Sequence, residues 1–283
     1  DEHWDFVEPT DTDMLLVPDP DSLRRVPWAR EPTAQIIADC YKASGEPHPL
    51  ASRNVLKHIL QLYEEAGLRA EVAPEVEFFL VHKNTDPDYE LMPPKGRSGR
   101  REVARMSFSI DAVAEFEDFV EDMYDFADAQ ALDVDTLIHE NGAAQLEINF
   151  NHGDPLDMAD QVFVFKRTVR ETAQRHDMYA TFMAKPMQKE PGSALHIHQS
   201  ILSLETGKNI FNGPDDEPTA ELMHYIAGLQ RYTPDLISFY APNVNSYRRL
   251  APDISAPINL SWGYDNRTTA FPVSYTHLRA HET

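Results

Sequence analysis

Four stretches of the chain carry apolar residues at the spacing of an amphipathic helix. The first begins at Ser52, which we expect to act as its N-cap, and ends just before Gly67. Its predicted apolar face comprises Val55, Ile59, Leu62, Tyr63 and Ala66. The second covers residues 111–131, and its apolar stripe comprises Val113, Phe116, Val120, Met123 and Ala127. Two further helices are predicted over 156–176 and 219–232, whereas residues 1–50, rich in proline and aspartate, are typical of strands and loops.

Three shorter segments alternate between apolar and polar residues, as half-buried strands do. They cover residues 74–80, 144–150 and 193–201. Their polar faces carry Glu75 and Glu77 in the first, Gln145, Glu147 and Asn149 in the second, and His196, His198 and Ser200 in the third. We expect each strand to bury its apolar face and to present this polar row on the opposite side.

The polar rows contain the donor types of a metal site. Glu75 and Glu77 could simply point outward from a surface strand, but the apolar residues 78–81 that follow favour a central strand, where paired carboxylates need a cation. A lone His-x-His is often no more than a pair of polar strand residues. Further acids and imidazoles come from Glu140, Glu147, His196 and His198. Because carboxylates dominate, the set favours magnesium or manganese over zinc, and such ions commonly serve phosphates.

Phosphoryl transfer also needs fixed cations against the negative charge that develops. Candidates are Arg248 and Arg249 in NSYRRL and Arg267 in DNRTT. The chain contains no GxxxxGK[ST], no GxGxxG opening a helix and no GxSxG motif. A nucleotide bound by this chain would therefore lie in a different kind of fold.

Composition restricts the class of partner. The chain has 25 basic and 47 acidic residues and a net charge of −22, which argues against nucleic acid or an anionic membrane as a partner. The excess of acid suits metal ions or polyamines, or is simply a solvated acidic surface. Because there is no run of 18 apolar residues and no signal-peptide pattern, and Cys40 is the single cysteine, we expect a cytoplasmic protein without a disulfide framework.

Six motifs in order make the chain similar to the glutamine synthetase family over about residues 12–271. They are PEVEFFL (74–80), HENGAAQLEI (139–148), FMAKP (182–186), GSALHIHQS (192–200), NSYRRL (245–250) and WGYDNRTTAF (262–271). The resemblance implies an α+β fold, with a catalytic domain built from a curved antiparallel sheet and outer helices, preceded by the remnant of a small β-grasp domain. It also implies an ATP-dependent ligase that makes γ-glutamyl phosphate from glutamate and lets an amine displace the phosphate.

The resemblance further implies two divalent ions in each site, Mg²⁺ or Mn²⁺. Matched motif by motif, Glu77, Glu140 and Glu147 look like the ligands of the ion nearer to glutamate, and Glu140 would also lie close to that substrate. Glu75 and His196 look like two ligands of the ion nearer to ATP.

The substrate contacts follow from the same motifs. His198 would face the phosphates of ATP and Ser200 the adenine end. The backbone at Gly192 and the side chain of Arg249 resemble the glutamate clamp, with Arg249 taking the α-carboxylate. Arg267 resembles the arginine that contacts ATP and stabilises the phosphoryl group in transfer.

The segment after NSYRRL departs from glutamine synthetases proper. It reads APDISAP (251–257), with Ser255 where those enzymes carry a glutamate that binds and deprotonates ammonium. The segments 26–35, 181–186 and 241–250 also look closer to the γ-glutamylputrescine synthetase branch. We therefore expect putrescine or another polyamine as the amine, with a glutamine synthetase that uses ammonia as the alternative. Pro191 replaces an asparagine common in the family, so one contact to glutamate should be missing.

The resemblance predicts a chain that is cut at both ends. Residues 1–45 would be the remnant of the N-terminal domain, 46–271 an incomplete catalytic domain, and 272–283 a tail foreign to the family, of the kind translated from vector sequence. Such a chain should be a poor catalyst or none. Members of the family form homo-oligomers, commonly dodecamers of two hexameric rings, and the full-length protein is expected to do the same.

Two other functions fit part of the pattern. A metal-dependent hydrolase, with His-x-His and carboxylates on barrel strands, would use zinc to activate water and would need no ATP. A non-catalytic member of the family would have a structural or sensing role, but the presence of the predicted metal ligands and of Arg267 argues against it.

Overall fold

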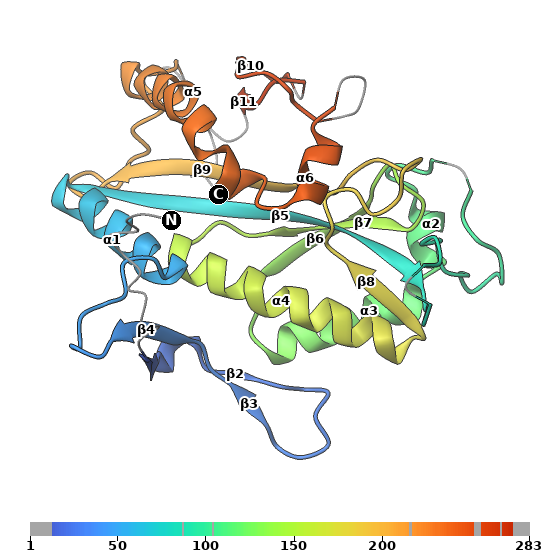
Figure 1. Ribbon diagram of the computed structural model, residues 1–283. Coiled ribbons are helices and arrows are strands. Elements are labelled where there is room, and N and C mark those ends of the chain that lie inside the picture. Colours follow the sequence, from blue (N-terminus) through green and yellow to red (C-terminus); the bar gives the residue numbers. More distant parts are fainter. Residues whose placement is uncertain are drawn as a thin grey trace, which may run out of the picture.

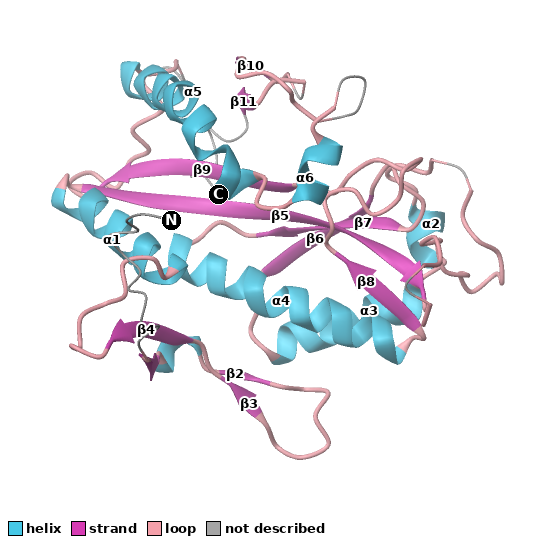
Figure 2. Ribbon diagram, in the orientation of Figure 1, coloured by secondary structure: helices cyan, strands magenta, loops and turns pink. Residues whose placement is uncertain are grey.

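The computed structural model describes residues 13–86, 88–103, 105–214, 217–251, 256–266 and 268–273. Its centre is an antiparallel sheet with the strand order β6 (Val134–His139), β7 (Gln145–Phe150), β5 (Leu68–His82) and β8 (Met178–Thr181). A further strand, β9 (Leu195–Ser203), also pairs with β5. Figures 1 and 2 show this sheet as a middle layer with helices on both sides.

Strand β5 connects the whole sheet. Along one edge, β7 pairs with residues 75–79 of β5. Along the other edge, β9 pairs with residues 68–76 and β8 with residues 79–82. The middle of β5 is therefore hydrogen-bonded on both edges, and Phe78, Phe79 and Leu80 are fully buried. This confirms the prediction of a central strand.

Helices α3 (Glu117–Ala129) and α4 (Pro155–Arg175) cover one face of the sheet, and α1 (Ser52–Glu65) lies along the first half of β5 (Figure 1). The core between them is made of Val76, Phe78, Leu80, Leu146 and Ile148 from the strands and Phe119, Met123, Phe165 and Val169 from the helices. On the opposite side lie α5 (Ala220–Tyr240), α6 (Val244–Arg249), β10 (Trp262–Tyr264) and β11 (Phe271–Val273) (Figure 1). None of the described helices has the length and apolar character needed to cross a membrane.

The predicted helices all exist, but three of their details were wrong. Ala51, not Ser52, is the N-cap of α1, and it makes no side-chain cap bond. The helix expected over 111–131 is divided into α2 (Ile110–Ala114) and α3, because Phe116 leaves the helical conformation and turns a buried side chain into the core. The last helix continues past Pro234 to Tyr240, although a proline removes one backbone hydrogen bond and crowds the preceding turn.

Apolar faces were also predicted to be buried in two places where the structure exposes them. Leu195 and Ile197 are about half exposed, because β9 is an edge strand and the described helices do not cover its first half. On α1, Val55, Ile59 and Leu62 are exposed, whereas Tyr63 packs against a small second cluster around Ile201 and Phe211. Periodicity identified these faces correctly but could not say whether another element would cover them.

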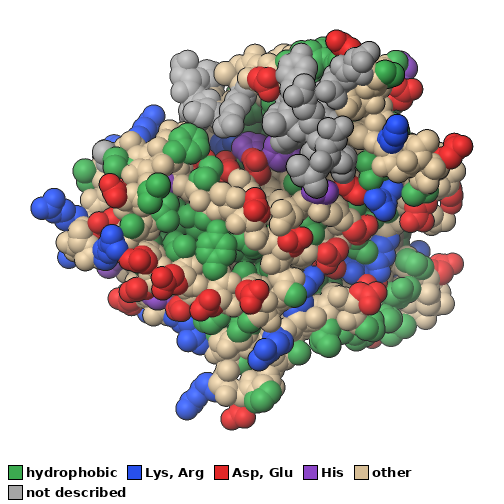
Figure 3. Space-filling view, turned by 180° about the vertical axis from the view of Figure 1, so that it is seen from behind, with side chains coloured by type: hydrophobic (Ala, Val, Ile, Leu, Met, Phe, Trp, Pro, Cys, Tyr) green, Lys and Arg blue, Asp and Glu red, His purple; other side chains and the backbone are tan. Residues whose placement is uncertain are grey.

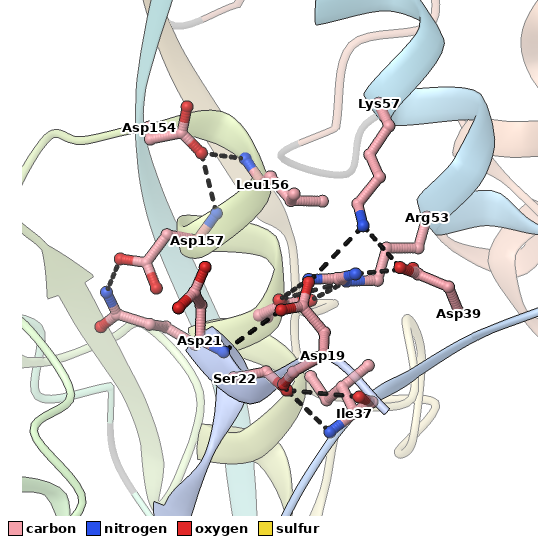
Figure 4. A network of polar contacts seen from close by, with 12 residues as sticks. Asp19, Asp21, Ser22, Ile37, Asp39, Arg53, Lys57, Asp154, Leu156 and Asp157 are labelled. Carbon is pink, nitrogen blue, oxygen red and sulfur yellow. Dashed lines mark hydrogen bonds and ion pairs between the residues drawn. The ribbon is translucent and has the colours of Figure 1, made fainter. Parts of the chain in front are cut away.

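The N-terminal residues form two short antiparallel pairs, β1 (Met14–Pro18) with β4 (Ala38–Lys42) and β2 (Arg24–Arg25) with β3 (Ala34–Gln35). Arg53 of α1 joins them to the helices. Its guanidinium nitrogens lie 2.7 Å from Asp19, 2.6 Å from Asp39 and 2.8 Å from Asp160 of α4. Figure 4 shows Arg53 and Lys57 pointing together at Asp19 and Asp39. Arg53 therefore links three aspartates that come from distant parts of the chain.

Alanine substitution at two glycines tests the backbone conformation, because neither added methyl group would disturb the packing. Gly67, just after α1, has φ +73°, and an added Cβ would meet no atom within 4 Å. Because L side chains disfavour this conformation, we expect Gly67→Ala to lower the free energy of unfolding by about 1 kcal/mol. Gly228 lies inside α5 with equal space around it, so Gly228→Ala should raise that energy by about 0.5–1 kcal/mol. Urea denaturation measures both, and a change of the same sign at the two positions would contradict the prediction.

Candidate active site

The register of the sheet brings four of the predicted ligands onto one face. Glu75 on β5 lies opposite His196 on β9, and Glu77 on β5 lies opposite Glu147 on β7. Directly opposed residues on neighbouring strands place their side chains on the same face. Ligand atoms of Glu75, Glu147 and His196 all lie within 4.8 Å of one another. We call Glu75, Glu77, Glu140, Glu147 and His196 the acid cluster.

Glu75 contacts both histidines of β9. Its Oε1 is 2.6 Å from Nε2 of His198, and its Oε2 is 3.2 Å from Nδ1 of His196. Burial by itself would raise the pKa of Glu75, but the hydrogen bonds from His196 and His198 outweigh it and hold the pKa well below its usual range. The bond to Glu75 in turn raises the pKa of His196. Glu75 is therefore an ionised carboxylate.

Glu77 is buried and fixed by two donors. Its Oε2 accepts hydrogen bonds from Nε2 of Gln145 and from the backbone N–H of Ala194, each at 3.0 Å. Gln145 Nε2 also donates to the carbonyl oxygen of Gly192 at 3.0 Å. Burial raises the pKa of Glu77. The donors orient this carboxylate even though burial disfavours its charge.

Glu147 has the least favourable position for a charge. Its burial, followed by the charges of Glu75, Glu77 and Glu140, raises the pKa of Glu147 to about 8. Glu140 follows directly after β6 and is half-buried. Carboxylates gathered in this way repel one another unless a cation compensates them.

The donor set fits a divalent metal ion. It offers mostly carboxylate oxygens and one imidazole, which suits hard ions such as Mg²⁺ or Mn²⁺ better than Zn²⁺. The raised pKa of Glu147 is the observation that supports the fit, because a bound cation would remove the repulsion that causes part of it.

Arg249, the last residue of α6, lies against Gly192. A Cβ on Gly192 would come within 2.7 Å of Cγ and Cδ of Arg249 and within 2.4 Å of the carbonyl oxygen of Ala184. Ser193 donates its backbone N–H to that same oxygen at 3.0 Å. Burial lowers the pKa of Arg249, and Glu77 partly opposes this. Only a glycine therefore fits at position 192 while the arginine stays at the edge of the acid cluster.

A pair of hydrogen bonds holds α6 to the loop before β9. The backbone N–H of Lys185 donates to Oδ1 of Asn245 at 2.8 Å, and Nδ2 of Asn245 donates to the carbonyl oxygen of Lys185 at 2.9 Å. Lys185 lies in the motif FMAKP and Asn245 in NSYRRL, but neither residue was predicted to belong to the site. Gln145 was not predicted as a site residue either, although its place on the same polar strand face as Glu147 could have indicated it.

A cavity of about 260 Å³ lies beside the acid cluster. Its walls come from β5, β7 and β9 and the residues after β7, and include Glu71, Glu75, Asn149, His152, His198 and Ser200. Histidine and acidic side chains gather near the top of the face shown in Figure 3. His198 and Ser200, predicted to contact the nucleotide, thus border one hollow next to the predicted metal ligands.

The structure therefore brings together Glu75, Glu77, Glu147 and His196, places Glu140 and Arg249 beside them, and puts His198 and Ser200 on the adjoining cavity. Arg267 and Ser255 lie outside the described residues. Arg248 is exposed on α6.

Comparisons with known proteins agree with this arrangement. Residues 49–282 match the family model for the glutamine synthetase catalytic domain. The chain is 34% identical over 263 residues to glutamine synthetase of Pyrococcus abyssi, covering 93% of this chain and 56% of that protein. It is also 34% identical over 252 residues to gamma-glutamylputrescine synthetase PuuA of Escherichia coli, covering 87% of this chain and 53% of that protein.

Among solved structures, a GmaS/ADP complex matches with a TM-score of 0.79 and 27% identity, covering 95% of this chain and 61% of that one. The chain spans about half the length of the curated relatives it matches. The ordered motifs, the α+β fold and these matches together show that the chain belongs to the glutamine synthetase family.

Proposed function

We propose that this protein is an ATP-dependent ligase that joins the γ-carboxylate of glutamate to an amine. The observation that supports this most strongly is the convergence of the acid cluster on one sheet face next to a cavity. In the proposed reaction the γ-carboxylate oxygen of glutamate attacks the γ-phosphorus of ATP and ADP leaves. The amine nitrogen then attacks the γ-carbonyl carbon of the γ-glutamyl phosphate, inorganic phosphate leaves, and the nitrogen releases a proton to solvent as the amide forms.

The acid cluster is proposed to hold two ions, Mg²⁺ or Mn²⁺. Glu77, Glu140 and Glu147 would hold the ion nearer to glutamate, and Glu75 and His196 the ion nearer to ATP. When bound, such ions neutralise phosphate oxygens and the charge that develops on them during transfer. The same carboxylates would keep the phosphates away from the site in the absence of metal, because like charges repel.

The cavity beside Glu75 is proposed to take the nucleotide. His198 borders it at the end next to the acid cluster and would face the phosphates, and Ser200 lies two residues further along β9, toward the proposed adenine end. Arg267 would stabilise the phosphoryl group during transfer; this role rests on the motif alone. Isothermal titration with ADP and Mg²⁺ tests the assignment, and unchanged ADP affinity in both His198→Ala and Ser200→Trp would contradict it.

Arg249 and the backbone at Gly192 are proposed to hold glutamate, with Glu140 close by. We expect Gly192→Ala to weaken glutamate binding by about 10-fold or more, because its Cβ would displace either the Arg249 stem or the Ala184 carbonyl. The affinity for Mn²⁺ should change little, since the carboxylates are not displaced. Calorimetric titration with glutamate measures the effect, and Gly228→Ala serves as the matched control. Unaltered glutamate affinity in Gly192→Ala would remove Gly192 from the site.

The amine is proposed to be putrescine or another polyamine, because Ser255 replaces an acid in the ammonium-binding segment. The chain is 34% identical both to a glutamine synthetase and to a gamma-glutamylputrescine synthetase, so overall identity favours neither ammonia nor an alkylamine as the substrate. The test measures phosphate release from ATP and glutamate with ammonium, putrescine or spermidine. Faster turnover with ammonium would overturn the acceptor, and no amine-dependent release with any of them would overturn the reaction class.

The assay should compare the 283-residue chain with a version extended to the length of its relatives. We propose that the shorter chain is a poor catalyst, and equal activity of the two would contradict this. We also propose that the protein is cytoplasmic, that residues 1–45 and 46–271 form separate domains and that the extended protein forms rings of identical subunits. Light scattering on the extended protein tests the last point, since a particle with the mass of one extended chain would contradict the rings.

A further inference from the structure

We infer that Glu102 and His139 are positioning residues that hold the turn 140–145 in the shape that places Glu140 and Glu147 in the acid cluster. This turn joins β6 to β7, so it connects a ligand just after one strand to a ligand in the next. The inference rests on the proposed metal site and adds two residues that do not themselves bind the ion.

The turn has a backbone that needs support. Ala144 is fully buried and has φ +56°, a left-handed conformation that alanine disfavours. The ends of the turn are pinned to the sheet, because Glu140 N–H donates to the Gln145 carbonyl at 2.8 Å and Leu80 N–H donates to the Ala144 carbonyl at 2.9 Å. Between these points the backbone donors of residues 142–144 turn away from the ladder.

Side-chain oxygens accept all three of these donors. Gly142 N–H donates to Oε1 of Gln145 at 2.9 Å. Ala143 N–H donates to Oε2 of Glu190 at 3.0 Å. Ala144 N–H donates to Oε2 of Glu102 at 2.8 Å. Buried backbone donors need such partners, so the turn keeps its shape only while these acceptors are in place.

Glu102 also connects the turn to His139. The same Oε2 that accepts the Ala144 N–H is 3.0 Å from Nε2 of His139, whose side chain is completely buried. The other ring nitrogen, Nδ1, is 2.8 Å from the carbonyl oxygen of Glu140. Because a carbonyl oxygen can only accept, Nδ1 carries the proton and donates it. One carboxylate oxygen therefore holds the end of the turn directly and its beginning through the imidazole.

Glu102 itself comes from the long connection between β5 and α2. Removal of its carboxylate would leave the buried Ala144 N–H without its acceptor and would remove the contact to Nε2 of His139. The turn would then relax, and Glu140 and Glu147 at its two sides would lose their fixed separation. Substitution of groups that orient metal ligands commonly weakens metal affinity by about 10–100-fold.

The experiment measures Mn²⁺ affinity and amide hydrogen exchange in the same variants. Glu102→Ala should bind Mn²⁺ about 10–100-fold more weakly than the unmodified chain. Its Ala144 amide should exchange at least about 10-fold faster in the metal-free state, since its acceptor is gone. Glu102→Gln should lose less Mn²⁺ affinity than Glu102→Ala, because its amide oxygen still accepts the hydrogen bond from Ala144 N–H. Glu90→Ala, an exposed glutamate in the same connection, is the control and should match the unmodified chain within about twofold.

The outcomes separate this inference from the proposed function. If the unmodified chain binds Mn²⁺ and Glu102→Ala binds it equally well, the positioning role is overturned and the metal site stands. If Glu102→Ala loses affinity while exchange at Ala144 is unchanged, positioning through the turn is overturned. If the unmodified chain binds no Mn²⁺, both proposals fail. Should Glu102→Ala not fold, Glu102→Asp decides, because it keeps the carboxylate on a side chain one methylene too short for the contact to Ala144. Unaltered Mn²⁺ affinity and unaltered exchange at Ala144 in that variant would overturn the inference.

Discussion

Glu147→Gln is expected to weaken Mn²⁺ binding by about 100-fold or more and, at the same time, to stabilise the metal-free protein. The loss of affinity follows because the substitution removes a ligand carboxylate, and even groups that only orient ligands are worth about 10–100-fold. The gain in stability follows because Glu147 is buried among other acids, whereas glutamine keeps the shape of the side chain without the charge. Two effects of opposite sign from one substitution distinguish a ligand from a structural residue.

The gain in stability should depend on pH. The pKa of Glu147 is raised from 4.5 to about 8 in the folded chain. Between these values the unfolded chain is ionised and the folded chain is protonated, so folding takes up a proton and stability falls as pH rises. Glutamine has no such dependence, and the advantage of Glu147→Gln should therefore grow from about pH 5 to about pH 8.5.

Thermal unfolding in the presence of a chelator measures this advantage. We expect the midpoint of Glu147→Gln to rise by a few degrees at high pH, since about 1 kcal/mol shifts it by roughly 2–4 °C in a chain of this size. Glu121→Gln, at an exposed site on α3, should change neither the midpoint nor the Mn²⁺ affinity. A Glu147→Gln variant that binds Mn²⁺ normally would falsify the assignment of this residue as a ligand.

Arg53→Ala is expected to lower the free energy of unfolding by about 3–5 kcal/mol, because it leaves buried carboxylates without their cation. The side chains of Arg53, Asp39 and Asp160 are 14%, 7% and 11% exposed, so solvent screens them little. Lys57 cannot replace Arg53 fully. Its Nζ lies 2.5 Å from Asp39 but 3.5 Å from Asp19, and the ion pair to Asp160 is made by Arg53. The loss should also free the N-terminal strands from α1 and α4.

Acid should remove the same contribution. The hydrogen bond from Arg53 lowers the pKa of Asp19. Burial would raise the pKa of Asp39, but Lys57 and Arg53 together lower it. Because both pKa values are lower in the folded chain than in the unfolded chain, the stabilisation is present above the usual pKa of 3.8. It is lost as the pH falls through the pKa values of the folded chain. The difference between the unmodified chain and Arg53→Ala should therefore shrink below about pH 4.

Urea denaturation at neutral and acidic pH measures both effects. Arg97→Ala is the control, because Arg97 forms an ion pair with Glu117 in which both side chains are more than half exposed, and such pairs contribute about 1 kcal/mol or less. If Arg53→Ala cost no more than Arg97→Ala at neutral pH, the buried network would not hold the N-terminal strands in place.

The family assignment depends on ordered motifs and was available from the sequence, as was the face of each strand. Alternation in 74–80 and 144–150 separated Val76, Phe78 and Leu146 from the glutamates, and all three apolar residues are in the core. The helical stripe of Phe116, Met123 and Ala127 is buried as predicted. These features could be predicted because period and burial follow from local geometry.

Tertiary structure decided which faces are covered and which polar groups meet. No local pattern shows that β9 is an edge strand with Leu195 exposed, that Glu75 stands opposite His196, or that Glu102 reaches the turn at Ala144. Periodicity describes one element at a time, whereas register and burial depend on partners far away in the chain. The sequence therefore showed the chemistry of the site as a set of residue types. Its geometry arose only when β5, β7 and β9 paired and the connections from β5 to α2 and from β8 to β9 packed around them.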